Sequence, residues 1–265
     1  MTLSLLMSKT LEGKVVVVTG ASAGIGAALA EELAARGASV VLVARRAEAL
    51  DAIRSKIGDR ALSIVADVTR REDHARVVKE AIAKFGHVDA WVNNAGRGIS
   101  RKASELTDAD IDLMMLVNVK SALYGLQAVL PHFRERKSGH VVNVSSMLGR
   151  VPMAPIRAAY SASKHALNSL SANLRMELAP ENILVSVVHP GVVATEFGLN
   201  ALHGGFDSRQ MPGAQSAEEV AKVIADAIEK RHADVYTREG ARQMIAAYYA
   251  AEDMAAAETK PPFFR

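Results

Sequence analysis

Residues 15–26, VVVVTGASAGIG, constrain the fold of this 265-residue chain more than any other stretch. Four consecutive valines are β-branched and apolar on both faces, which favours a strand buried from both sides, as in a parallel sheet under helices. Glycines follow at positions 20, 24 and 26, and then comes an Ala-, Leu- and Glu-rich segment typical of a helix. A strand, a glycine turn and a helix in this order allow a pyrophosphate to approach bare N–H groups at a helix N-terminus. A tight turn without a ligand is the alternative.

Strand-like and helical segments alternate along the rest of the chain. We expect strands at residues 15–19, 39–44, 61–66, 89–93, 140–145, 184–189 and 233–237. We expect helices at residues 24–36, 47–57, 71–85, 109–136, 158–178 and 217–230. The repeated order of strand and helix predicts right-handed βαβ units, and therefore an α/β fold in which helices flank a doubly wound parallel sheet of about seven strands.

The chain shows no linker, repeat or low-complexity block, so we expect a single dinucleotide-binding domain over residues 10–265. Its least regular stretch is 192–213, which contains four glycines and Pro212. A loop of that length in a compact domain is more often a binding loop than filler. We therefore predict a substrate lid around residues 192–213.

Composition excludes several classes of function. The chain has no cysteine, and its 8 histidines are scattered without H-E-x-x-H spacing, so we expect no disulfide, no thiolate nucleophile and no metal site. The net charge is +3 and no long basic run is present, which argues against nucleic acid as a partner. The apolar stretch within residues 1–10 is too short for a signal peptide, and no segment reaches about 18 apolar residues. We expect a cytoplasmic protein that does not enter a membrane.

Polar residues at the ends of the second and third expected strands suit the adenosine half of a dinucleotide. The residue about 20 positions after the glycines meets the adenosine ribose in such folds. Arg45 stands there in place of an acid, and its guanidinium pairs with a 2′-phosphate, so we predict NADP(H) in preference to NAD(H), which remains possible. Asp67 is expected to accept the adenine amino group. The alternatives are a solvated helix start for Arg45 and an N-cap for Asp67.

A second group of residues suits proton transfer. Tyr160 and Lys164 are four residues apart on the expected helix 158–178 and therefore share one helix face. An ammonium near a phenol, whose pKa is ordinarily about 10, favours the tyrosinate. Ser146 follows the fifth strand at the sheet edge where ligands bind in open α/β folds, and its hydroxyl suits a substrate carbonyl. Taken alone, Tyr-x-x-x-Lys also occurs by chance on exposed helices.

These motifs in series resemble the short-chain dehydrogenase/reductase family, in its compact, NAD(P)-dependent subfamily. T-G-x-x-x-G-I-G, Asn-Asn-Ala-Gly, Ser, Tyr-x-x-x-Lys and Pro-Gly follow one another at that family's distances across nearly all of residues 14–236. The resemblance implies a Rossmann fold, an oxidoreductase activity and a nicotinamide cofactor.

The resemblance also implies roles for individual residues. Its pyrophosphate turn corresponds to Gly20, Ser22, Gly24, Ile25 and Gly26. Its remaining cofactor segments correspond to Asn94 and Gly96, and to Pro190, Gly191 and Thr195 over the nicotinamide amide. Tyr160 is the implied general acid/base, and Lys164 is implied to lower the tyrosine pKa and to bind the nicotinamide ribose. Ser146 is implied to orient the carbonyl, and Asn118 to hold a relay water.

Two positions depart from the family's usual pattern. Ala23 stands where many NADP-preferring members carry a basic residue, so the cofactor preference depends on Arg45. His189 precedes Pro190, and we interpret it as a strand-end histidine without a role.

We therefore expect an enzyme that transfers hydride between nicotinamide and the carbonyl or secondary alcohol of a small molecule. Apolar residues favour an apolar substrate: Met147, Val151, Met153, Pro155 and Ile156 on the expected wall, and Phe197, Leu199, Leu202 and Phe206 in the lid. The alternatives are an NAD-dependent alcohol dehydrogenase of the same family and a non-catalytic NADP-binding sensor. The long helices 109–136 and 158–178 serve as subunit interfaces in relatives, which implies a homo-oligomer, either a dimer or a tetramer.

Overall fold

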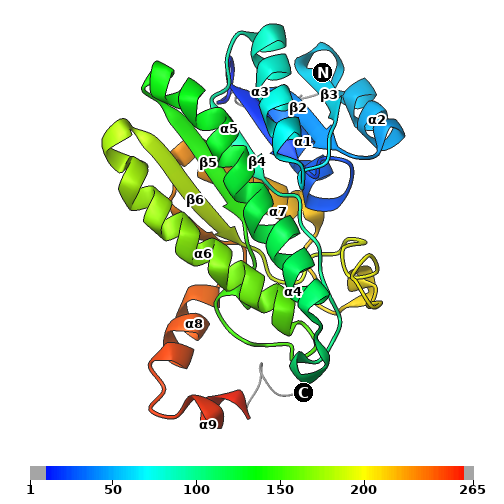
Figure 1. Cartoon of the computed structure of the whole chain (residues 1–265), viewed down its shortest axis with the longest axis vertical. Coiled ribbons are helices and arrows are strands. Elements are labelled where there is room, and N and C mark those ends of the chain that lie inside the picture. Colours follow the sequence, from blue (N-terminus) through cyan, green and yellow to red (C-terminus); the bar gives the residue numbers. More distant parts are fainter. Residues whose placement is uncertain (1–9, 260–265) are drawn as a thin grey trace, which may run out of the picture.

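The computed structural model describes residues 10–259. The N-terminal stretch in which no signal peptide is expected lies mostly outside these residues, as do positions 260–265 of the expected domain. Within the described chain, seven parallel strands form one sheet in the order β3-β2-β1-β4-β5-β6-β7 (Figure 1). The strands are β1 (Val15–Thr19), β2 (Ser39–Ala44), β3 (Ala61–Val65), β4 (Ala90–Asn93), β5 (Gly139–Val144), β6 (Ile183–His189) and β7 (Asp234–Tyr236). The predicted doubly wound parallel sheet of a single-domain α/β protein is confirmed.

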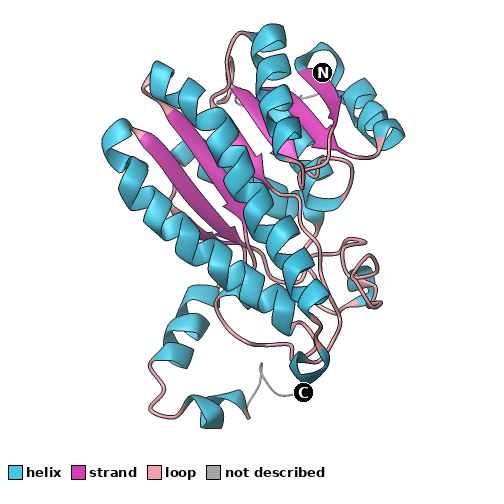
Figure 2. Cartoon of the chain, viewed as in Figure 1, coloured by secondary structure: helices cyan, strands magenta, loops and turns pink. Residues whose placement is uncertain are grey.

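Helices cover both faces of this sheet (Figure 2). They are α1 (Gly24–Ala35), α2 (Ala47–Ile57), α3 (Arg71–Phe85), α4 (Asp108–Met115), α5 (Ser121–Arg136), α6 (Ala158–Leu178), α7 (Ala217–Lys230), α8 (Ala241–Tyr249) and α9 (Met254–Glu258). The helix expected at 109–136 is present as α4 and α5, joined by a π-helical turn, Leu116–Lys120. The short helices α8 and α9 were not expected, and they lie at one end of the molecule, beyond the sheet (Figure 1).

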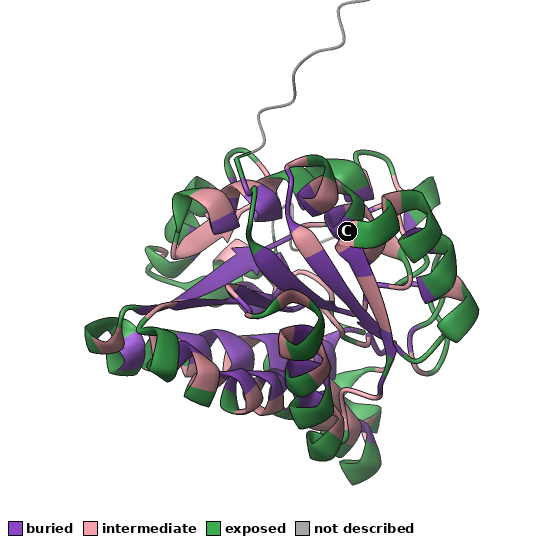
Figure 3. Cartoon of the chain, turned by 90° about the horizontal axis from the view of Figure 1, so that it is seen from above, coloured by how far each residue is buried: buried purple, intermediate pink, exposed green. Residues whose placement is uncertain are grey.

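Successive side chains of β1 pack against different helices on the two faces of the sheet. Val16 and Val18 belong to the cluster formed with α1, α2 and α7, whereas Val15 and Val17 belong to the cluster formed with α3, α5 and α6. Because successive side chains of a strand point to opposite faces, a strand of valines alone fills both clusters. Figure 3 shows the buried strands between two layers of helices whose outer surfaces are exposed.

The glycine turn brings α1 close to the ends of β1 and β4. A Cβ at position 26 would lie 2.3 Å from the Gly20 carbonyl oxygen, so only glycine permits this approach. Thr19 Oγ1 donates to the Val92 carbonyl at 3.1 Å and accepts from the backbone N–H of Asn94 at 3.0 Å. The sheet order reverses direction between β1 and β4, and ligands bind at such a switch point beyond the carboxyl ends of the strands.

The run Asp108–Arg136 is 29 residues long and contains an 18-residue window with a mean hydropathy of 1.4, so by length and composition alone it could cross a membrane. The sequence expectation concerned an unbroken stretch of about 18 apolar residues, and Asp112, Asn118 and Lys120 interrupt this run. Leu126, Val129 and Phe133 on this run are buried against the sheet. A buried core helix of a globular domain can have the same length and hydropathy as a membrane-spanning helix.

Candidate active site

A cavity of about 760 Å³ opens at the carboxyl ends of the strands, at the switch between β1 and β4. It extends from Arg45 and Asp67, past the glycine turn, to Ser146 and Tyr160. Its lining includes these residues of the predicted site: Gly20, Ser22, Gly24, Ile25, Arg45, Asp67, Asn94, Gly96, Ser146, Tyr160, Lys164, Pro190, Gly191 and Thr195. The elongated shape, with bare backbone at its middle and an arginine at one end, fits an extended dinucleotide.

Gly26 and Asn118 are the two predicted site residues that do not line the cavity. Gly26 lies beneath the turn, where its missing side chain admits the Gly20 carbonyl and the Asn94 amide. Gly26 allows the close packing of α1 on the turn, and its contact with a cofactor stays a prediction. The Asn94 Nδ2 group donates to the Thr19 carbonyl at 2.9 Å, which braces the same turn.

Two arginine side chains, Arg45 and Arg46, follow β2 at the end of the cavity that is expected to hold adenosine (the adenosine end). Arg45 is exposed on the cavity wall and makes no side-chain hydrogen bond or ion pair to any part of the chain from residue 10 to residue 259. Arg46, in contrast, donates to Ser22 Oγ at 3.1 Å and to the Ser22 carbonyl at 3.3 Å. Arg46 thereby ties the end of β2 to the glycine turn and leaves Arg45 as the unengaged cation there.

Asp67 forms a local turn at the same end. Its Oδ1 atom accepts from the backbone N–H and the hydroxyl of Thr69, at 2.9 and 2.8 Å. The helix α3 has Arg70 as its N-cap residue, so the alternative of Asp67 as a helix N-cap is wrong. The Asp67 carboxylate also lines the cavity, which keeps it available to a donor group of a ligand.

Ser146, Tyr160 and Lys164 meet at the other end of the cavity. Burial raises the pKa of the Tyr160 phenol to about 12, and a hydrogen bond with Ser146 and the charge of Arg157 oppose that rise. Burial lowers the pKa of Lys164 to about 8. The Lys164 ammonium donates to the Val144 carbonyl at 2.8 Å and lies 5.7 Å from the centre of the Tyr160 ring. In this arrangement the groups that lower the tyrosine pKa are Ser146 and Arg157, while the lysine is held at the end of β5.

Asn118 lies in the π-helical turn and is buried behind the cavity wall. Its Nδ2 donates to the Arg97 carbonyl and to Ser163 Oγ, both at 3.0 Å, and its Oδ1 accepts from the Arg97 N–H at 2.9 Å. A Cβ on Gly96 would come within 3.1 Å of that oxygen. Both amide donors are therefore engaged by protein, and the side chain fixes the segment that follows β4.

The apolar wall differs from the one expected. The cavity is lined by Leu113, Leu116, Val117, Leu148, Phe197 and Phe206. Among the wall residues named from the sequence, Val151 and Met153 instead pack against α8, through Ile245, Tyr248 and Met244. The expectation was wrong there because α8 covers this segment from outside. Met147, Pro155, Ile156, Leu199 and Leu202 do not line the cavity either.

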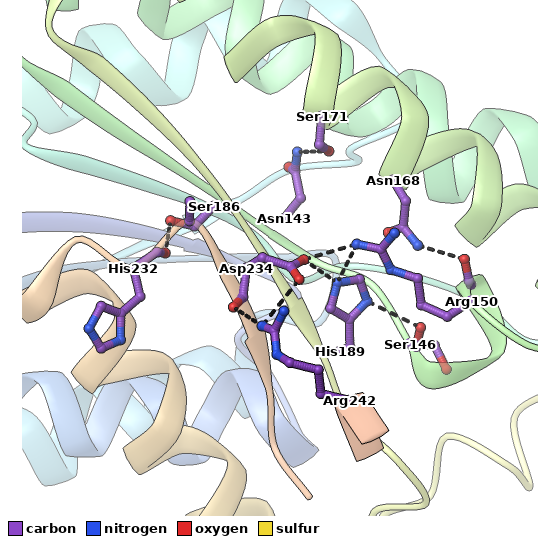
Figure 4. Close-up of polar contacts among 12 residues, drawn as sticks. Asn143, Ser146, Arg150, Asn168, Ser171, Ser186, His189, His232, Asp234 and Arg242 are labelled. Atoms are coloured by element: carbon purple, nitrogen blue, oxygen red, sulfur yellow. Dashed lines mark hydrogen bonds and ion pairs between the residues drawn. The ribbon is translucent and has the colours of Figure 1, made fainter. Parts of the chain in front are cut away.

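A buried polar network stands behind Ser146 (Figure 4). His189, fully buried at the end of β6, places Nδ1 3.4 Å from the Ser146 carbonyl oxygen and Nε2 2.8 Å from Asp234 Oδ1. Arg150 donates to the same carboxylate oxygen at 3.0 Å, and Arg242 donates to the Asp234 carbonyl at 3.1 Å. The sequence interpretation gave His189 no role, and no motif joins it to Asp234. The network links β6 and β7 to the loop that carries Ser146.

A family profile and individual relatives match this chain. The profile of the short chain dehydrogenases matches residues 14–203. An uncharacterized oxidoreductase of Staphylococcus epidermidis is 40% identical over 189 residues, which cover 71% of this chain and 81% of that protein. An uncharacterized oxidoreductase of Listeria innocua is 41% identical over 192 residues, which cover 71% of this chain and 77% of that protein.

Solved structures match over most of the chain. A short-chain dehydrogenase from Streptomyces avermitilis superposes with a TM-score of 0.80 at 35% identity, covering 93% of this chain and 95% of that one. A 3-ketoacyl-(acyl-carrier-protein) reductase from Brucella melitensis, complexed with NADH, gives 0.77 at 30% identity, covering 85% and 96%. A serine dehydrogenase complexed with NADP⁺ gives 0.74 at 30% identity, covering 79% and 87%. These complexes support a nicotinamide dinucleotide as the cavity's ligand.

We expect Asp234→Asn to destabilise the protein at neutral pH and much less in acid. Burial disfavours the Asp234 carboxylate, but the hydrogen bond and charge of His189 together with Arg150 outweigh it and lower its pKa to about 2. The unfolded chain has an aspartate pKa of about 3.9, so the carboxylate stabilises the fold above that value and loses the effect as the pH falls towards 2. Thermal unfolding of both proteins between pH 7 and 2 measures this difference.

Asp112→Asn is the control for this measurement, because Asp112 is exposed on α4 and has no ion pair in the described chain. A stability difference for Asp234→Asn that stays constant down to pH 2, or is absent at pH 7, would contradict the role assigned to the carboxylate.

Proposed function

The chain belongs to the short-chain dehydrogenase family, and we propose that within this family it is an NADP(H)-preferring oxidoreductase acting on a carbonyl or secondary alcohol. One observation carries the proposal. A single cavity joins an unpaired arginine, Arg45, at its adenosine end to Ser146, Tyr160 and Lys164 at its other end. The first feature suits a 2′-phosphate, and the second suits proton transfer to a substrate oxygen.

In the proposed reduction, the hydride for the carbonyl carbon would come from a nicotinamide cofactor held in this cavity. The Ser146 hydroxyl holds the carbonyl oxygen, and the Tyr160 hydroxyl delivers a proton to it, so the product is an alcohol. Lys164 keeps positive charge near the phenol, binds the nicotinamide ribose and aids the return of a proton. Asn118 keeps the segment after β4 in place. A relay water here would be held by the second lone pair of Asn118 Oδ1 or by backbone groups. Preorganised polar groups of this kind supply much of the rate enhancement of enzymes.

The proposed substrate has an apolar body. The aliphatic wall from α4 and the π-helical turn faces Phe197 and Phe206 of the stretch 192–213, which we propose to be the substrate lid. The Phe197 ring lies 5.7 Å from the Tyr160 ring, so an apolar group between the lid and the phenol would be shielded from water. A cytoplasmic location remains a prediction from the sequence.

Tyr160→Phe should lower kcat by about three orders of magnitude or more, because it removes the proton donor while keeping the ring. Cofactor binding should change little. Reduction of a panel of ketones, followed by NADPH absorbance, measures the first effect, and NADPH fluorescence titration measures the second. Turnover near that of the wild type would remove Tyr160 from the chemistry.

Arg45→Ala should raise the Kd for NADPH by about tenfold or more and leave the Kd for NADH nearly unchanged, because one charge-assisted contact to phosphate is lost. Arg54→Ala, an exposed arginine on α2 outside the cavity, is the matched control. Tighter binding of NADH than NADPH by the wild type would instead support an NAD-dependent dehydrogenase, in line with the NADH complex of a relative.

We also propose that the protein forms a homo-oligomer through the outer surfaces of α5 and α6. Met176 on α6 is 70% exposed in the isolated chain, and a second copy of the chain packed on this surface would bury it. Light scattering should give a dimer or tetramer of the 28.2 kDa chain. A monomer at micromolar concentration would contradict the proposal.

A further inference from the structure

Arg157 lies at the reaction end of the cavity and was not singled out by any sequence motif. It is the N-cap residue of α6, three positions before Tyr160, and so shares a helix face with the phenol. It lines the cavity although only 6% of its surface is exposed. Its charge is close enough to lower the pKa of Tyr160.

The guanidinium of Arg157 has no anionic partner. Its one side-chain hydrogen bond within residues 10–259 runs from Nη1 to the Ile99 carbonyl, at 3.0 Å. Two carboxylates line the described cavity: Asp67 at the far end, and Glu196, which lies 3.6 Å from Arg209. A guanidinium offers five donors, and a buried charge without a counter-ion is costly. The Arg157 guanidinium is therefore able to bind an anionic group of a ligand.

Two other partly buried arginines near the site, Arg101 and Arg150, have counter-ions, whereas Arg97, which lines the cavity and is less buried than Arg157, has none within residues 10–259. Arg101, on the loop beside Arg157, lies 2.8 Å from Asp110, and Arg150 lies 3.0 Å from Asp234. The charges of Arg101 and Arg150 are thus neutralised by carboxylates of the chain itself. Among Arg101, Arg150 and Arg157, only Arg157 combines a place on the cavity wall with the lack of a carboxylate.

Gly98, Phe197 and Phe206 surround Arg157 on the cavity wall. A Cβ on Gly98 would lie 3.2 Å from Arg157 Nη1 and 3.1 Å from the Phe197 ring, so the glycine lets both side chains pack closely against the backbone. The Phe206 ring lies 5.1 Å from the guanidinium carbon. An aromatic face of this kind holds the guanidinium in one orientation and excludes water without neutralising its charge.

We propose that Arg157 binds a carboxylate of the substrate, which makes the substrate an oxo acid or hydroxy acid with an apolar body. The inference rests on the proposed oxidoreductase function and narrows its substrate class. A planar guanidinium pairs with a carboxylate through two parallel hydrogen bonds, which orients the substrate as well as holding it. The carboxylate binds at Arg157, the carbonyl lies at Ser146 and Tyr160, and the apolar remainder lies under Phe197 and Phe206.

The test compares straight-chain eight-carbon oxo acids, with the carbonyl at successive positions, against their methyl esters. Wild-type kcat/KM should be about 10- to 100-fold higher for the best acid than for its ester, the effect of one charge-assisted pair. Arg157→Gln should lower kcat/KM for the ester too, because it removes a charge that lowers the pKa of Tyr160, and should lower it about 10- to 100-fold further for the acid, so that the preference is lost. Arg157→Lys should keep part of the preference. Arg209→Gln, which removes an exposed arginine of the lid outside this cavity, should keep the full preference.

The outcomes separate the inference from the proposed function. Equal losses on acid and ester in Arg157→Gln, or a wild type that prefers the esters, would show that Arg157 only supports the wall, and the oxidoreductase proposal would stand. If no carbonyl compound consumes NADPH or NADH, the proposed function fails. The carboxylate site is then judged by binding: the best-stabilising acid should raise the unfolding temperature of the NADPH-loaded wild type and not of Arg157→Gln, and equal shifts would overturn it.

Discussion

The close contact between the glycine turn and the ends of β1 and β4 is the constraint on which the whole site depends. No side chain fits between the Gly26 α-carbon and the Gly20 carbonyl, and Thr19 and Asn94 lock the neighbouring strand ends together. The adenosine end and the reaction end of the cavity lie on opposite sides of this junction. Their separation is therefore set by backbone packing, which varies far less than loop conformation does.

Burial and charge oppose each other at the reaction end. Burial alone favours the neutral forms of Tyr160 and Lys164, and the pKa values of about 12 and about 8 reflect this. At Tyr160 the hydrogen bond of Ser146 and the charge of Arg157 act against the effect of burial. Polar groups fixed in such surroundings interact with developing charge more strongly than they would in water, because the rigid protein cannot screen them as mobile solvent does. The network of His189 and Asp234 extends this rigidity to the backbone of Ser146.

The sheet, its flanking helices and the spacing of Tyr160 and Lys164 could be predicted from local patterns, because valine runs, glycine turns and helix periodicity are properties of neighbouring residues. Contacts between distant segments could not. Asp234 and His189 are 45 positions apart, and the packing of α8 on Val151 leaves no periodic signal. The π-helical turn was missed because its composition is that of a regular helix. Arg157 was within reach of sequence reasoning, since its three-residue spacing from Tyr160 places both on one face.

The π-helical turn between α4 and α5 has a consequence for how this chain can vary. One extra residue in a helical turn rotates everything after it by about 100° relative to a regular helix, since each residue of an α-helix advances by that angle. Leu113 and Leu116 before and within the turn face the cavity, while Leu126 and Phe133 after it face the sheet. Deleting a single residue here would leave the hydropathy and length of the run almost unchanged, yet would turn Leu126 and Phe133 away from the sheet. Homologous segments should therefore tolerate exchanges of apolar side chains far better than any change in residue count.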